Sequence, residues 1–232
     1  MVRSLMFLLS VLMANNVIAD DHETTAPAML SLMSIAVEDG RGFLSAMETF
    51  ADSECRKQLP VSIRVMDNDF NGEDPSTHTI IWGFQKADDY SAFGEILSSC
   101  SAFQQFWMYM RPSLRLSEFL AVPVFTDGDT SKDSVYRVWR HHITDEATYI
   151  EEMAKVRAAA KKAGRGDGAM GILRVIGGRS PTVTHMVYFG AKDLPSMINN
   201  LGRLPETAVF LKNVADIRTV YDNSIAFVEA DF

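Results

Sequence analysis

The feature of this 232-residue chain that most restricts its fold is one order of strands and helices that occurs twice. In the first half, apolar runs typical of strands cover residues 29–37, 61–66, 77–84 and 117–125. Apolar residues at helical spacing predict one helix that starts at Gly40 and ends before Pro60, and another over 87–110. The order in this half is therefore strand, helix, strand, strand, helix, strand.

The second half repeats this order. Its predicted strands and helices cover residues 135–143, 145–163, 171–176, 184–189, 192–217 and 223–230 in turn. Short sequences also match: SIRVM at 62–66 corresponds to ILRVI at 172–176, and DPSTH at 74–78 corresponds to SPTVTH at 180–185 with one inserted residue. We interpret the pattern as an internal duplication of a unit of about 100 residues.

The N-terminus has the pattern of a secretory signal peptide. Arg3 precedes an apolar run at 5–13 that is too short to cross a membrane, and small or modest side chains lead up to Ala19, directly before Asp20. We predict cleavage after Ala19 and an exported protein, periplasmic or secreted. The predicted organisation is a signal peptide at 1–19, an acidic leader at 20–28, a first unit at 29–125, a polar linker at 126–134 and a second unit at 135–232.

The chain has two cysteines, Cys55 near the end of the first predicted helix and Cys100 within the next. An oxidising compartment permits a disulfide between them, provided that their Cα atoms lie within roughly 7 Å. If the two helices run antiparallel, Cys100 lies a few turns too far along for easy pairing. Two alternatives stay open: a Cys55–Cys100 disulfide, or two buried and unpaired side chains.

Charge and hydropathy exclude two kinds of partner. The formal net charge is -8, whereas nucleic acid is held mainly by clustered Lys and Arg, so we expect no nucleic-acid partner. No apolar run reaches about 18 residues, so we expect no membrane span. The hydrophobic fraction of 47% is that of an ordinary folded protein.

A strand–helix–strand–strand–helix–strand unit is ferredoxin-like: a four-stranded antiparallel sheet with both helices on one face. With two such units in tandem, the chain resembles the dimeric α/β-barrel superfamily. This superfamily includes small antibiotic-biosynthesis-type monooxygenases, stress-responsive barrel proteins and haem-handling relatives. The resemblance implies an α+β fold of two tandem ferredoxin-like βαββαβ units whose antiparallel sheets pack face to face as an α/β barrel. It also implies a ligand cavity between the sheets, and either a monomer with an internal pseudo-dimer or a homodimer.

Two arginines are candidate ligand-binding residues. Arg64 and Arg174 stand mid-strand at matching places, and a long cation within a sheet needs water, a carboxylate or a ligand anion. The pair could line a cavity and bind a carboxylate or enolate. The alternative is a pair of outward-facing or salt-bridged structural arginines.

Two histidines and a tryptophan complete the candidate set. His78 alternates with Trp82 along one strand, and His185 alternates with Phe189 along another, so each ring should share a face with apolar neighbours. A histidine in such a place can act as a general base. The alternative is that each histidine caps a turn, with a carboxylate such as Asp74 as partner. Trp82 or Trp139 could wall a pocket for a flat apolar ligand or simply fill the core.

The remaining motifs give weaker indications of function. His141 and His142 are adjacent on a predicted strand and point to opposite faces, so at most one faces a cavity. No cluster has metal-ligand spacing, so we predict no metal site, and we predict no cofactor. The string GRGDG at 164–168 matches the GxxDG string of dye-decolorising peroxidases, but it follows a helical run, and we interpret it as a helix end with Arg165 in solvent.

We therefore predict an exported protein that binds a small aromatic or anionic molecule in a cavity between its two sheets. The predicted ligand-binding residues are Arg64, His78, Trp82, Arg174 and His185. One alternative is a cofactor-independent monooxygenase or isomerase of the dimeric α/β-barrel type, in which a histidine removes a proton from the substrate. Another is a structural or partner-binding module without a cavity. The chain has no catalytic motif that decides between an enzyme and a binding protein.

Overall fold

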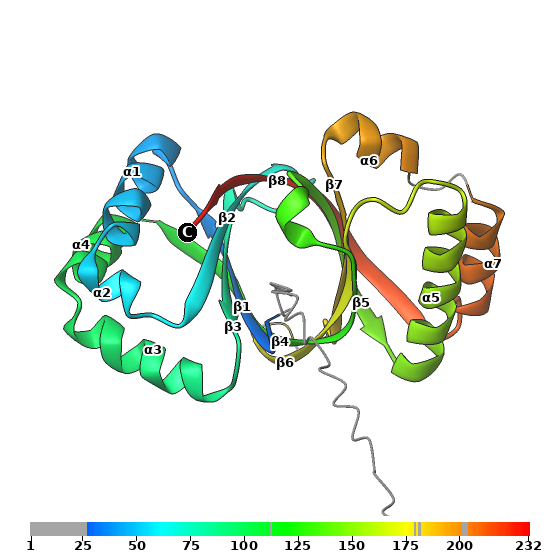
Figure 1. Ribbon diagram of the computed structural model, residues 1–232, viewed down its shortest axis with the longest axis horizontal. Coiled ribbons are helices and arrows are strands. Elements are labelled where there is room, and N and C mark those ends of the chain that lie inside the picture. Colours follow the sequence, from blue (N-terminus) through cyan, green and yellow to red (C-terminus); the bar gives the residue numbers. More distant parts are fainter. Residues whose placement is uncertain (1–26, 112, 179, 181, 201–203) are drawn as a thin grey trace, which may run out of the picture.

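The computed structural model describes residues 27–111, 113–178, 180, 182–200 and 204–232. The predicted signal peptide, and the leader up to residue 26, lie outside the described residues. In the described part, antiparallel strands form one closed barrel in the order β1-β3-β2-β8-β5-β7-β6-β4. Figure 1 shows the barrel in the centre with a layer of helices on either side. None of the described helices is both long and apolar enough to span a membrane.

The first half supplies four strands: β1 (Met29–Ala36), β2 (Val61–Phe70), β3 (His78–Phe84) and β4 (Leu114–Asp127). Its helices are α1 (Gly40–Ala51), α2 (Glu54–Lys57), α3 (Asp88–Ser99) and α4 (Ser101–Met110). The carboxylate of Asp39 accepts a hydrogen bond from the backbone N–H of Gly42 and so caps the start of α1. The second predicted helix is broken at Cys100, between α3 and α4.

The second half supplies β5 (Val135–Ile143), β6 (Met170–Gly178), β7 (His185–Ala191) and β8 (Arg218–Asp231). Its helices are α5 (Glu146–Lys162), α6 (Leu194–Asn200) and α7 (Pro205–Asn213). The carboxylate of Asp145 caps α5, and Pro205 at the first position of α7 suits a helix start, where no N–H is needed. The predicted linker contains the end of β4 and the short 3-10 helix η1 (Thr130–Lys132).

The predicted fold class, two ferredoxin-like sheets packed face to face, is wrong. The strand order is the same in both halves, β4-β1-β3-β2 and β8-β5-β7-β6. The halves join edge to edge, however: β4 pairs with β6 and β8 pairs with β2, so one sheet closes on itself. Edge strands carry unpaired backbone N–H and C=O groups, and closure satisfies them. Face-to-face packing would leave those edges open.

The length of β4 and β8 makes closure possible. Each has 14 residues, so each is longer than the strand predicted there. One part of β4 pairs with β1, and a second part, from Phe119 to Asp127, pairs with β6. In the same way β8 pairs first with β5 and then with β2. A register shift follows Pro123, a residue with no N–H to give to the ladder.

Apolar side chains pack against both the outer and the inner face of the barrel wall. On the outer face, the first half packs its helices around Phe43, Met47 and Phe50, each fully buried. The helices of the second half pack around a separate cluster that includes Tyr149, Met170 and Phe210. Inside the barrel two further clusters include Met66, Tyr136, Phe119, Ala121, Leu173 and Met186. The centre of the barrel is therefore largely filled by side chains.

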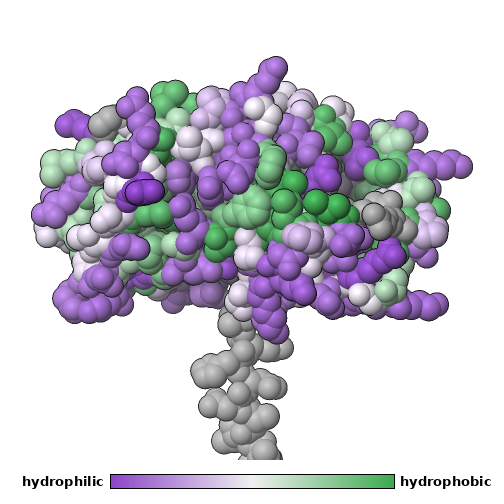
Figure 2. Space-filling view, turned by 90° about the horizontal axis from the view of Figure 1, so that it is seen from above, coloured by the Kyte–Doolittle hydropathy of each residue, from purple (hydrophilic) through white to green (hydrophobic). Residues whose placement is uncertain are grey.

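The face of the molecule seen from above is mainly polar, with apolar groups between the helix layers. Figure 2 shows this face from above, where apolar side chains gather near the middle and polar ones surround them. The exposed large apolar residues of the described chain include Phe70 on β2 and Val220 and Tyr221 on β8. These strands belong to the seam where the two halves join.

Cys55 and Cys100 form a disulfide, with Cα atoms 5.8 Å apart. The argument from antiparallel helices placed Cys100 a few turns too far along the second predicted helix. Instead the chain turns at Ser53, ahead of α2, and again at Cys100, and these two breaks bring the cysteines together.

Removing this disulfide is expected to destabilise the protein. The bridge joins residues 45 positions apart, and its loss frees the unfolded chain, so a Cys55→Ala/Cys100→Ala variant should lose roughly 2–4 kcal/mol of unfolding free energy. For a chain of this size the Tm should fall by roughly 6–12 °C. Differential scanning fluorimetry with and without reductant measures the effect. A reductant that leaves the wild-type Tm unchanged would contradict it, and the double variant should not respond to reductant at all.

Candidate functional site

A pocket lies on the outer face of the second half of the barrel, between its strands and the helices α5, α6 and α7; we call it the helix-side pocket. Its volume is about 360 Å³, within the range of roughly 300–1,000 Å³ typical of small-molecule sites. The apolar part of its wall includes Trp139, Met153, Val187, Phe189 and Phe210. The rings of Trp139 and Phe189 meet edge to face at 5.4 Å, and such a wall suits a flat apolar ligand.

His141 brings a buried nitrogen without a partner to this wall. The residue is 1% exposed, and its Nδ1 lies 3.3 Å from the hydroxyl of Tyr149. Its Nε2 has no hydrogen-bond partner among the described residues. Burial first, then the positive charge of Arg218 and the nearby His185, lower the pKa of His141 to about 4. The ring is therefore neutral at pH 7, with Nε2 left for a ligand.

Four arginines line the same pocket: Arg137, Arg157, Arg165 and Arg218. Arg157 is held by Asp127 at 2.7 Å. In contrast, Nε of Arg137 and Nη1 of Arg165 are buried without a hydrogen-bond partner in the described chain. A buried guanidinium nitrogen without an acceptor is unfavourable, and a ligand oxygen would relieve it. The helix-side pocket therefore favours a ligand that is mainly apolar but carries an anionic group.

Two glycines make a close backbone contact at the wall of this pocket. Gly168 and Gly190 both line it. A Cβ built on Gly168 would overlap the backbone carbonyl oxygen of Gly190, and the backbone N–H of Gly190 donates to the carbonyl of Ala169 at 2.7 Å. Only a residue without a side chain allows this approach.

The two predicted arginines do not share a site. Arg64 faces the barrel interior, where Nε and Nη2 bind the carboxylate of Asp231 at 2.6 and 2.8 Å and Nη1 donates to the hydroxyl of Tyr136 at 2.9 Å. Arg174 lies on the helix side of β6, with Nε 3.3 Å from Glu146. Carboxylates of the protein thus hold both side chains, and the matched strings place them on opposite faces of the barrel wall.

The two predicted histidines occupy equivalent places at the starts of β3 and β7. The Nδ1 atoms of His78 and His185 lie 2.8 and 2.9 Å from the hydroxyl of the preceding threonine. Their Nε2 atoms face carboxylates, Glu229 at 3.2 Å and Glu146 at 2.9 Å. A carboxylate partner is the alternative that the sequence offered for each ring, although Asp74 is not that partner. Glu146 also brings His185 together with Arg174.

Trp82 is 5% exposed and packs between the rings of Phe50 and Phe93. None of the five predicted ligand-binding residues lines the helix-side pocket. His141 lines it, whereas Nδ1 of the adjacent His142 contacts the carbonyl of Thr182, so the prediction that the two rings face opposite sides is confirmed.

The site contains residues outside the predicted ligand-binding set, although the sequence offers Trp139 as a pocket wall and His141 as one ring that could face a cavity. Arg137, Trp139 and His141 alternate along β5 and so share one face, a signal that strand periodicity could have revealed. Arg165 was predicted to lie in solvent at a helix end. The structure corrects this: after α5 the chain folds back toward the barrel, and Arg165 becomes part of the pocket wall.

The comparisons with known proteins give a fold and no family. No family model matches the chain, and no curated protein matches it. Three solved structures illustrate the similarity. A candidate monooxygenase from Fusobacterium nucleatum subsp. nucleatum ATCC 25586 is 12% identical, with 89% of this chain and 94% of that chain covered and a TM-score of 0.59. A mutant chlorite dismutase from Candidatus Nitrospira defluvii is 10% identical, with 89% and 92% covered and a TM-score of 0.56. A heme-binding protein from Thermus thermophilus is 11% identical, with 88% and 91% covered and a TM-score of 0.51.

These neighbours correct one prediction and support another. One structure with this fold is named as a heme-binding protein, so the prediction of no cofactor is corrected at the level of the fold, which is one that can carry haem. The resemblance to the dimeric α/β-barrel superfamily agrees with all three neighbours. The chain therefore has the fold of the dimeric α/β-barrel proteins.

Proposed function

We propose that this protein binds haem in the helix-side pocket and acts as an oxidoreductase. The observation that carries the proposal is the buried Nε2 of His141, which lines the pocket and has no partner within the described residues. Neighbours named as a heme-binding protein and as chlorite dismutases add support from the fold.

The residues present fit haem in three ways. His141 would hold the iron through Nε2 in the neutral tautomer whose proton is on Nδ1, which leaves the Nε2 lone pair for the metal. The Tyr149 hydroxyl at Nδ1 would fix the orientation of the ring, as partners of metal-bound histidines generally do. Trp139 and Phe189 offer apolar contact to a flat macrocycle, and the free nitrogens of Arg137 and Arg165 offer partners for its carboxylates. Bound haem supplies one-electron and oxygen chemistry that side chains lack.

A hemin titration tests the proposal. Wild-type protein should shift the Soret band of hemin with a one-to-one end point, whereas His141→Ala should weaken binding by roughly 100-fold, since even the loss of a ligand's own partner costs about 10–100-fold. His142→Ala is the matched control, because it removes the neighbouring ring from the other face of β5. Equal Soret shifts for the two variants would contradict His141 as the ligand, and no shift with wild type would reject haem.

The cofactor-independent monooxygenase is a second candidate for the same pocket. It is favoured by the neighbours named as candidate monooxygenases and by the combination of an aromatic wall with unpaired arginine nitrogens, which suits an aromatic acid. In this case hemin should leave the Soret band unchanged, whereas an aromatic carboxylate such as naphthoate should quench the fluorescence of Trp139, and Trp139→Phe should remove the response.

Two further proposals concern origin and location. We propose that the halves arose by duplication, on the support of their identical strand order and the equivalent surroundings of His78 and His185. We also propose that the protein is exported, since its N-terminal sequence is typical of a signal peptide and a disulfide suits an oxidising compartment.

A further inference from the structure

A second pocket opens at one mouth of the barrel; we call it the barrel-mouth pocket. Its volume is about 270 Å³. The residues that line it include Ser117, Phe119, Arg140, Thr182, Tyr221 and Asp222. They come from β4, β5, β8 and the segment between β6 and β7, so both halves of the chain build this pocket.

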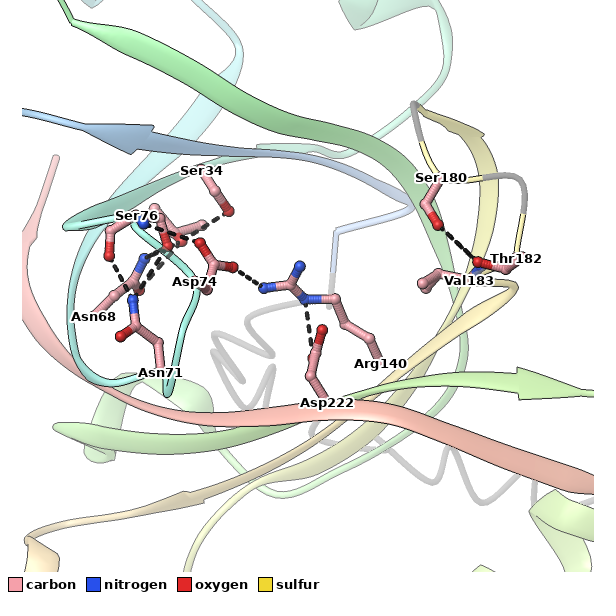
Figure 3. Close-up of polar contacts among 11 residues, drawn as sticks. Ser34, Asn68, Asn71, Asp74, Ser76, Arg140, Ser180, Thr182, Val183 and Asp222 are labelled. Atoms are coloured by element: carbon pink, nitrogen blue, oxygen red, sulfur yellow. Dashed lines mark hydrogen bonds and ion pairs between the residues drawn. The ribbon is translucent and has the colours of Figure 1, made fainter.

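Arg140 stands at the centre of this mouth, as Figure 3 shows. Its Nη2 lies 2.7 Å from a carboxylate oxygen of Asp74, and its Nε lies 3.3 Å from one of Asp222. The two carboxylates hold the guanidinium from two sides, and among the residues that Figure 3 draws none contacts its third nitrogen, Nη1. The side chain is therefore fixed in place while one donor stays available for a ligand.

The charge of the cluster restricts the ligand. One guanidinium and two carboxylates leave an excess of negative charge within a few ångströms, so an anion is disfavoured. Asp222 is 47% exposed at its side chain, whereas Arg140 and Asp74 are about half as exposed. An oxygen of Asp222 therefore remains accessible as an acceptor for a ligand O–H group.

Hydroxyl groups supply much of the remaining polar lining. Ser117 Oγ is buried and has no hydrogen-bond partner among the residues that the structure describes. The hydroxyls of Ser180 and Thr182 lie 3.1 Å apart and bond to one another. Phe119, 3% exposed, gives the pocket an apolar floor. The pocket thus combines donors and acceptors with an apolar surface.

The two loops at this mouth are the ones whose sequences match between the halves. In the first, DPSTH, Asp74 supplies the carboxylate that orients Arg140. In the second, SPTVTH, the matching position is Ser180, a neutral residue. Among the described residues, one side of the mouth therefore presents the paired carboxylate of Asp74, and the other presents the hydroxyls of Ser180 and Thr182.

We infer that the barrel-mouth pocket binds a small polyhydroxylated molecule that carries no negative charge. A hydroxyl both donates and accepts, so vicinal hydroxyls match a free guanidinium nitrogen, a carboxylate oxygen and serine and threonine side chains at once. A neutral ligand avoids the repulsion that an anion meets at Asp74 and Asp222. The volume lies just below the range of roughly 300–1,000 Å³ of drug-sized sites, so it limits the ligand to a small one.

Saturation-transfer difference NMR on the full-length folded protein tests this inference. Three probes share the same ring and differ in charge: neutral glucose, anionic glucuronate and cationic glucosamine. Glycerol and inositol are two further neutral probes. A neutral polyol should receive saturation, glucuronate should bind at least about tenfold more weakly than glucose, and glucosamine should bind at least as tightly as glucose.

Three variants and two controls make the test specific. Ser117→Ala and Thr182→Val should each weaken the binding of the neutral probe by several-fold, and Asp222→Asn should raise the relative binding of glucuronate. Asp231→Asn is the matched control, since Asp231 holds Arg64 nine residues further along β8. His141→Ala is the second control, because it changes only the helix-side pocket. Circular dichroism and Tm establish that each variant is folded.

Each remaining outcome counts against the inference. It is overturned if no neutral probe receives saturation, if glucuronate binds more tightly than glucose, if glucosamine binds more weakly than glucose, or if Ser117→Ala and Thr182→Val bind the neutral probes as wild type does. Loss of binding in His141→Ala would move the polyol to the helix-side pocket and would equally reject the barrel-mouth pocket as its site.

Discussion

Replacing Gly168 by Ala is expected to lower the unfolding free energy by roughly 3–5 kcal/mol and to reduce ligand binding in the helix-side pocket. The added Cβ would overlap the carbonyl oxygen of Gly190. Both partners belong to backbone that is held in place, because Gly190 donates to Ala169 and Ala169 donates to the buried carboxylate of Asp133 at 2.8 Å. The overlap can therefore be relieved only by moving a strand.

Gly94→Ala is the matched control for this prediction. Gly94 lies within α3, and a Cβ there meets no atom within 4 Å. Alanine should raise the unfolding free energy by about 0.5–1 kcal/mol, since glycine is a poor helix former. Urea denaturation followed by circular dichroism measures both variants. A Gly168→Ala protein as stable as wild type would show that the close approach of the two strands is not required by the fold.

The sequence predicts the elements of this fold better than their assembly. Strand and helix periodicity follows from which face of each element is buried, so the order of elements is visible in it. The pairing of β4 with β6 and of β2 with β8 depends on backbone groups at the strand edges. Those groups are the same for every residue type, so hydropathy gives no sign of barrel closure.

For the candidate site, too, the sequence indicates residue types better than it indicates where they lie in the assembled fold. Arg64 and Arg174 stand in matching strings, yet register decides the face: Arg174 lies opposite His185, and the residue opposite His78 is Asp67. The register thus equates Arg174 with Asp67, which lies three positions after Arg64. A shift by an odd number of positions exchanges the two faces of a strand, which is why a matched string misled the prediction. Arg165 was missed for another reason, because a turn after α5, and no periodic pattern, brings it to the pocket.

The second large effect concerns pH: His141 is expected to account for about 3 kcal/mol of stability that is lost as the pH falls from 7 toward 4. The pKa of His141 is about 4 in the folded protein, and the ordinary value of 6.5 applies when the chain unfolds. A folded-state pKa below the unfolded one means that the unfolded chain binds the proton more tightly. The contribution is therefore complete above pH 6.5 and declines from there down to about pH 4.

Urea denaturation of wild type, His141→Gln and His142→Gln over this pH range isolates the contribution. Hydrogen bonds from Arg140 and Ser76 lower the pKa of Asp74 despite its burial. Protonation of such carboxylates also destabilises the protein in acid, but it does so equally in wild type and in both variants. The acid-dependent loss should therefore shrink in His141→Gln alone. The C2 proton of His141 should titrate in NMR near pH 4 in the wild type, and a midpoint near 6.5 would mean that water or a carboxylate reaches Nε2. That result would also remove the physical reason for a neutral ligand nitrogen in the helix-side pocket, because the ring would then be partly protonated near neutral pH.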